Sequence, residues 1–235
     1  MGRIRHIITA AAMALSFGAQ GAVAGSGPVV VELYTSQGCS SCPPADRMLG
    51  DLAGRDDVIA LALHVDYWDY IGWKDIFADP QYTKRQRSYA QAAGHRSVYT
   101  PQFIVQGQDH VIGAKSMKLS DAIQTHKAQA GNVEVELSRA GGKLRVSATS
   151  DRRFSAPLVV QLVTYKPKEA VSVKRGENAG RTLNYHNIVT SWQQVDKWNG
   201  AKPLSASYPV DAGAPVVVIV QEPGFGQILA AGHLR

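Results

Sequence analysis

The chain has 235 residues, of which 45% are hydrophobic and 19% are charged, a balance typical of an ordinary globular protein with one large domain or two smaller ones. Its net charge of +6 is not accompanied by a cluster of lysine and arginine with interleaved aromatic residues, so we expect no nucleic-acid partner. The densest basic group is Lys84, Arg85 and Arg87, which we interpret as the solvated face of a helix.

The first residues have the pattern of an export signal. Arg3 and Arg5 give a positive start, residues 7–17 form an apolar centre, and residues 22–24 are small, as at a cleavage site. We therefore predict a signal peptide over residues 1–24 and a periplasmic or secreted protein. No later stretch is long and apolar enough to cross a bilayer, so no membrane span is expected after signal removal.

The only two cysteines of the chain, Cys39 and Cys42, lie between a predicted strand and a predicted helix. Residues 29–34 form a compact β-branched run, and Pro43 and Pro44 fit the first turn of a helix, where a missing N–H costs little. A helix N-terminus offers unpaired N–H groups and a positive dipole end, which favours a thiolate at Cys39. The spacing places Cys42 close enough to close a small disulfide.

Two inert interpretations of this cysteine pair are weaker. A disulfide that closes so short a loop removes little entropy from the unfolded chain and is a poor staple. A closed structural zinc site needs four cysteine or histidine ligands, and no second cysteine pair exists. The pattern therefore favours redox or metal-handling chemistry.

The next elements extend this unit. Residues 58–66 are almost continuously apolar, which predicts a buried strand of a parallel sheet and a right-handed strand, helix, strand crossover. The aromatic stretch 67–73 is either a rim beside the cysteines that holds a peptide-like partner or, as is commoner for such rings, part of the core. We predict a helix in the second half of 75–93, a hairpin over 103–113 and a helix over 119–129.

This order of elements resembles the thioredoxin superfamily over roughly residues 28–130. Within it, residues 32–46 (ELYTSQGCSSCPPAD) and 100–103 (TPQF) resemble the uncharacterised secreted bacterial family called domain of unknown function 1223. The second resemblance covers nearly the whole mature chain. The first implies an α/β thioredoxin-like fold with a helical and aromatic insert, whereas the second adds little chemistry because the function of that family is not established.

The superfamily resemblance also implies roles for individual residues. Cys39 matches the attacking cysteine, Cys42 the resolving cysteine, and Pro101 the cis-proline that faces the dithiol. The backbone of Thr100 would then pair with the substrate chain. The sequence departs from the superfamily pattern because no tryptophan precedes Cys39 and because the intervening pair is Ser40-Ser41, so the direction of the reaction, oxidation or reduction, stays open.

The remainder of the chain, from about residue 132, reads as short strands separated by turns, which predicts an antiparallel, sandwich-like β domain. We therefore expect a signal peptide over 1–24, a thioredoxin-like domain over 25–131 and a β-rich C-terminal domain over 132–235. The charged, turn-rich loop 174–181 is either a solvated hairpin tip or a segment that leans over the dithiol and contacts a partner through Arg175 or Arg181.

The leading functional prediction is an exported thiol-disulfide oxidoreductase that acts through Cys39 and Cys42. Its partners would be protein or small-molecule thiols and disulfides, and Thr100 and Pro101 would be the substrate-binding residues. We expect no cofactor beyond the redox-active disulfide. One alternative is a Cu(I)-binding or copper-delivery protein, because two thiolates with the imidazole of His64 suit a soft metal. A weaker alternative is a non-catalytic binding module in which the β domain recognises a partner.

Overall fold

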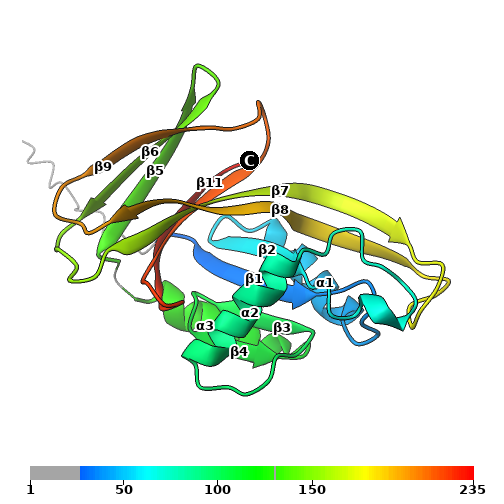
Figure 1. Cartoon of the computed structure of the whole chain (residues 1–235). Coiled ribbons are helices and arrows are strands. Elements are labelled where there is room, and N and C mark those ends of the chain that lie inside the picture. Colours follow the sequence, from blue (N-terminus) through cyan, green and yellow to red (C-terminus); the bar gives the residue numbers. More distant parts are fainter. Residues whose placement is uncertain (1–26, 130) are drawn as a thin grey trace, which may run out of the picture.

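The computed structural model describes residues 27–129 and 131–235, so the predicted signal peptide lies outside the described residues. Along the chain (Figure 1) the elements are β1 (Val29–Thr35), α1 (Pro43–Ala53), β2 (Val58–His64), the 3-10 helix η1 (Asp69–Ile71), α2 (Pro80–Ala92), β3 (Gln102–Val105), β4 (Asp109–Ile112), α3 (Ser116–Lys127), β5 (Val133–Ala140), β6 (Lys143–Ser150), β7 (Leu158–Ser172), β8 (Thr182–Trp198), β9 (Leu204–Pro209), β10 (Val216–Gln221) and β11 (Ile228–Leu234). One sheet has the order β11-β10-β7-β8-β2-β1-β3-β4, and a second has the order β5-β6-β9.

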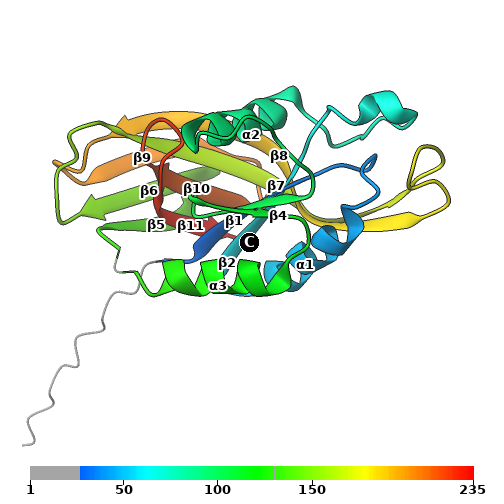
Figure 2. The same cartoon turned by 90° about the horizontal axis from the view of Figure 1, so that it is seen from below.

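The N-terminal half is built around β1 and β2, which pair in parallel with Thr35 opposite His64. Every residue of both strands is buried, as their continuous apolar runs predict. The strands β3 and β4 follow as antiparallel neighbours. Figure 2 shows α1 and α3 along one face of the sheet and α2 along the other, so that Leu49 and Ile123 join one core and Tyr82 the opposite one.

The C-terminal strands continue the same large sheet. The long strands β7 and β8 run side by side along the molecule (Figure 1), and β8 pairs in parallel with β2 at Ile188 and Ala62. The second sheet packs on the outer half of the large one through a shared core that includes Val146, Val160 and Val218. The molecule is thus a mixed α/β protein with a large sheet and few helices. The predicted units 25–131 and 132–235 are separate along the chain, whereas the sheet crosses the boundary between them.

The prediction of a solvated basic helix face is wrong for Arg85. Its side chain is buried, whereas Lys84 and Arg87 are exposed. The Arg85 guanidinium donates to both carboxylate oxygens of Glu32, at 2.7 and 2.8 Å, and its carbon lies 3.8 Å from the centroid of the Trp192 ring. The local sequence shows only the cluster of basic residues, because the acidic partner lies on β1, far away along the chain.

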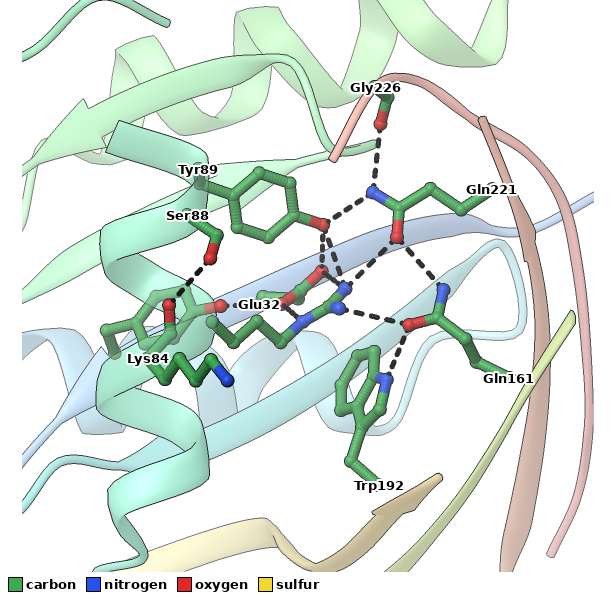
Figure 3. Close-up of polar contacts among 10 residues, drawn as sticks. Glu32, Lys84, Ser88, Tyr89, Gln161, Trp192, Gln221 and Gly226 are labelled. Atoms are coloured by element: carbon green, nitrogen blue, oxygen red, sulfur yellow. Dashed lines mark hydrogen bonds and ion pairs between the residues drawn. The ribbon is translucent and has the colours of Figure 1, made fainter. Parts of the chain in front are cut away.

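A network of buried polar side chains surrounds this ion pair (Figure 3). Tyr89 donates to Glu32, Arg85 donates to Gln161, and Gln161 donates in turn to Gln221, at distances of 2.8, 3.0 and 2.9 Å. These residues come from α2, β1, β7 and β10, so the network joins the N-terminal half of the chain to the C-terminal strands.

Among the described residues, no helix is of the length and apolar character needed to span a bilayer.

Candidate functional site

The two cysteines lie in the dithiol loop (residues 36–42), which leaves the end of β1 and enters α1. Cys42 is the N-cap residue of α1, and Pro43 occupies the first helical position, where a missing N–H has no intrahelical partner to lose. The two cysteines form a disulfide with their Cα atoms 5.4 Å apart. Cys39 is 2% exposed and Cys42 is fully buried, so the sulfurs are covered in this state.

The backbone of the dithiol loop is held by side chains from two other segments. The Gln37 N–H donates to Asp75 Oδ2 at 2.8 Å, and the Trp73 indole donates to the Gln37 side-chain oxygen at 2.8 Å. The Asn178 amide donates to the carbonyl oxygens of Gln37 and Cys39, at 2.9 and 3.0 Å. The loop is therefore fixed both by the aromatic segment after β2 and by a residue far along the chain.

Asn178 belongs to the hairpin tip (residues 173–181), which connects β7 to β8. Its side chain is fully buried, and Arg181 Nη1 donates to its Oδ1 at 2.7 Å, which orients the amide toward the dithiol loop. Gly176 has a φ of +76°, and a Cβ atom there would lie 3.3 Å from Trp73 Cβ, so a side chain would be strained and crowded. The loop 174–181 therefore contacts the dithiol loop, as one of the two interpretations of this segment requires. Asn178 makes the contact, and a partner contact through Arg175 or Arg181 stays a prediction.

Pro101 follows a cis peptide bond with Thr100, as the superfamily resemblance implies. Because Tyr34 pairs with Gln102 in the antiparallel register of β1 and β3, Pro101 comes next to Thr35, where the dithiol loop begins. The structure therefore brings the predicted substrate-binding segment to the same end of the sheet as the cysteines.

The aromatic segment links Thr100 to the dithiol loop. The Trp68 indole donates to Thr100 Oγ1 at 2.6 Å, and a Cβ atom at Gly38 would lie 3.2 Å from Trp68 Cβ. Tyr67 and Trp68 are half-buried against the core, whereas Tyr70 is 80% exposed and stacks on Trp68. The first rings of the segment therefore pack on the core, whereas a rim that holds a peptide-like partner stays a prediction.

A cluster of buried polar side chains lies behind the dithiol loop. Asp46 Oδ1 accepts from Thr35 Oγ1 at 2.7 Å, whereas Asp46 Oδ2 is buried and has no partner among the described residues. Burial raises the pKa of Asp46 to about 7, although the hydrogen bond from Thr35 opposes the shift. Burial also acts to raise the pKa of Asp75, but the charge of His64 and the hydrogen bonds that Asp75 accepts outweigh it, so that this pKa is lowered.

His64, the third ligand of the copper alternative, lies in this cluster. Its Nδ1 is 2.6 Å from Asp75 Oδ2, and its ring makes edge contacts with Phe77 and Tyr185 at centroid distances of 5.2 and 4.7 Å. Over residues 27–129 and 131–235, no three histidine, cysteine, aspartate or glutamate side chains are grouped so that they could hold a metal ion. The geometry thus gives the copper alternative no support.

Comparisons with known proteins agree with this architecture. A family model described as "Protein of unknown function (DUF1223)" matches residues 30–221. The chain belongs to the DUF1223 family. The crystal structure of protein AGR_C_4864 from Agrobacterium tumefaciens is similar to this structure, with a TM-score of 0.77. The two sequences are 33% identical, and the match covers 89% of this chain and 94% of that chain. No curated protein matches the chain.

A second solved structure, HBP35 of Porphyromonas gingivalis, is similar in fold alone. It is 18% identical to this DUF1223 protein, with a TM-score of 0.64 and coverage of 89% of this chain and 75% of that one. The family model over residues 30–221, and not this second structure, confirms the family resemblance inferred from the sequence.

Three residues of the site were not singled out from the sequence. Asp46 carries a local signal, since it lies one helical turn after Cys42 on the face that also buries Leu49. Asp75 and Asn178 carry no such signal, because their contacts with the dithiol loop depend on how distant segments pack in this DUF1223 protein.

Proposed function

We propose that this DUF1223 protein is an exported thiol-disulfide oxidoreductase with a thioredoxin-like unit, which exchanges the Cys39–Cys42 disulfide with thiols of protein or small-molecule partners. The observation that carries the proposal is the cysteine pair itself, closed as a disulfide at the N-terminus of α1 directly after a central strand. The strand order β2-β1-β3-β4, with α1 between β1 and β2, agrees with the superfamily resemblance. A periplasmic or extracellular location, where such a disulfide persists, is part of the proposal.

The exchange needs no group beyond the two sulfurs. In the reduced protein the positive end of the α1 dipole favours the thiolate form of Cys39. This thiolate attacks one sulfur of a partner disulfide, a Cys39–partner bond forms, and the other partner sulfur leaves as a thiolate. Cys42, as thiolate, then attacks Cys39 Sγ, restores the internal disulfide and releases the partner as a thiol. Two electrons pass from the dithiol to the partner, and the reverse sequence oxidises a partner dithiol.

The segment around Pro101 supplies the second part of the proposal. Thr100 and Pro101 lie beside the start of the dithiol loop, on an irregular stretch that precedes β3. We propose that the Thr100 backbone pairs with the chain of a peptide partner, while Tyr70 provides exposed aromatic surface at the same rim. Because both sulfurs are covered in the disulfide form, a bulky partner also requires a local opening of the site.

Single cysteine variants test the proposal. After reaction of each purified variant with 2-hydroxyethyl disulfide, intact-mass spectrometry should show a stable mixed disulfide for Cys42→Ser, because the resolving thiol is absent. Cys39→Ser should react far more slowly, because the remaining Cys42 is buried at the start of α1. The double variant is the control for non-specific labelling. Equal adduct formation by both single variants, or by neither, would contradict the assignment.

A further inference from the structure

A small cleft opens beside the first turn of α1, on the side that faces β8. Its walls include Pro43, Asp46 and Arg47 from α1, together with Arg181, Thr182 and Asn184 from the other side, and its volume is about 100 Å³. Pro43 directly follows Cys42, and Arg181 holds Asn178, which binds the Cys39 carbonyl. The cleft therefore adjoins the dithiol.

Two arginines that have no carboxylate partner line this cleft. Arg47 and Arg181 are exposed, and in the part of the chain that the structure describes neither has a carboxylate oxygen within 4 Å. Arg181 uses one nitrogen for Asn178, which leaves its other N–H groups available. A guanidinium presents paired N–H donors that match the two oxygens of a carboxylate. The charge of the cleft thus suits an anionic group.

Asp46 gives an independent indication of a ligand. Its side chain is only 5% exposed, it lines the cleft, and its Oδ2 is buried without a hydrogen-bond partner in the described structure. An unpartnered buried polar atom is costly unless a water molecule or ligand satisfies it. The cleft is therefore lined by two arginines, and one of its wall residues carries a buried carboxyl oxygen that lacks a partner.

We propose that this cleft binds the carboxylate end of a small thiol or disulfide and thereby presents its sulfur to the Cys39–Cys42 pair. The inference rests on the proposed function and names a substrate class for it. A space of about 100 Å³ accommodates a carboxylate with a few carbon atoms and is far too small for a folded partner. The covered position of both sulfurs also suits a small partner.

The test compares two disulfides of similar size that differ in end charge. The reduced protein is mixed with 3,3′-dithiodipropionate, which carries two carboxylates, or with neutral 2-hydroxyethyl disulfide, and the loss of protein thiols is followed at low ionic strength. In Arg47→Gln the rate with the dianionic reagent should fall about tenfold, as expected for loss of a charged hydrogen bond. The rate with the neutral reagent should stay within about twofold. Arg181→Gln should act in the same direction, but Arg47 is decisive because it does not contact the hairpin tip through a hydrogen bond.

Lys143→Gln is the matched control, because it removes one positive charge from an exposed position on β6. Its ratio of the two rates should equal that of the wild type. If Arg47→Gln keeps the wild-type ratio, or if Lys143→Gln changes the ratio equally, the carboxylate site is wrong while the oxidoreductase proposal stands. If neither reagent oxidises the reduced wild type, the proposed function itself is wrong. The melting temperature of each oxidised variant shows whether it is folded.

Discussion

At the scale of single residues, Asp46 makes the free energy of unfolding depend on pH. Burial raises its pKa from the ordinary value of 3.8 to about 7. Between these values the folded protein binds more protons than the unfolded chain, so the contribution of Asp46 to the free energy of unfolding falls as the pH rises. We expect Asp46→Asn, which cannot ionise, to gain stability relative to the wild type by about 1.4 kcal/mol for each pH unit across this window.

Urea unfolding of the two oxidised proteins at about pH 4, 6 and 8 measures this difference. The contributions of histidines and carboxylates that do not interact with Asp46 cancel in the comparison. Asp51→Asn is the control, because Asp51 is exposed on the same helix and its replacement should leave the difference nearly constant. A difference between Asp46→Asn and the wild type that does not change with pH would mean that Asp46 ionises normally.

At the scale of elements, the hairpin tip is bonded to the dithiol loop through one side chain. Asn178 donates to two carbonyl oxygens of the dithiol loop, and each such buried hydrogen bond contributes about 1 kcal/mol. Asn178→Ala should therefore loosen the tip and speed the reduction of the Cys39–Cys42 disulfide by dithiothreitol about tenfold. The rate is measured by alkylation of the released thiols and mass spectrometry.

Glu177→Ala provides the comparison for this experiment. Glu177 is the exposed neighbour of Asn178 on the same tip, so its replacement tests the effect of truncation without loss of the contact with the dithiol loop. Its reduction rate should match that of the wild type. Equal rates for Asn178→Ala and the wild type would show that the tip does not limit access to the sulfurs.

These elements also show what the sequence predicts and what it leaves open. The strands β1 and β2 and the start of α1 were predicted because apolar runs and prolines are local signals. The cysteine pair and the Thr100-Pro101 segment were found from motifs. Asn178 was not, because the residue that touches the dithiol loop depends on the lengths of β7 and β8 and on the parallel pairing of β8 with β2. Register between distant strands leaves no local pattern.

At the scale of the whole molecule, the buried ion pair joins the two halves of the chain. Arg85 on α2 binds Glu32 on β1 and Gln161 on β7, and its guanidinium lies over the Trp192 ring of β8. The sequence predicted a domain boundary at about residue 131, because the pattern of residues changes there. Such a pattern shows local composition and does not show which strands pair with one another. Since one sheet contains strands from both sides of that position, we expect both halves to unfold in a single cooperative transition.

Arg85→Met tests this expectation. The variant leaves the Glu32 carboxylate buried without its cation, which should lower the free energy of unfolding by about 3–5 kcal/mol. Hydrogen exchange with increasing denaturant, followed by mass spectrometry, should show peptides of β1 and β10 losing protection at the same, lowered midpoint. A second replacement, Glu32→Gln, removes the unpaired charge and should recover part of the loss. If only the peptides from α2 and β1 shifted while β10 kept its wild-type midpoint, the two halves would be independent folding units and the network would stabilise one of them alone.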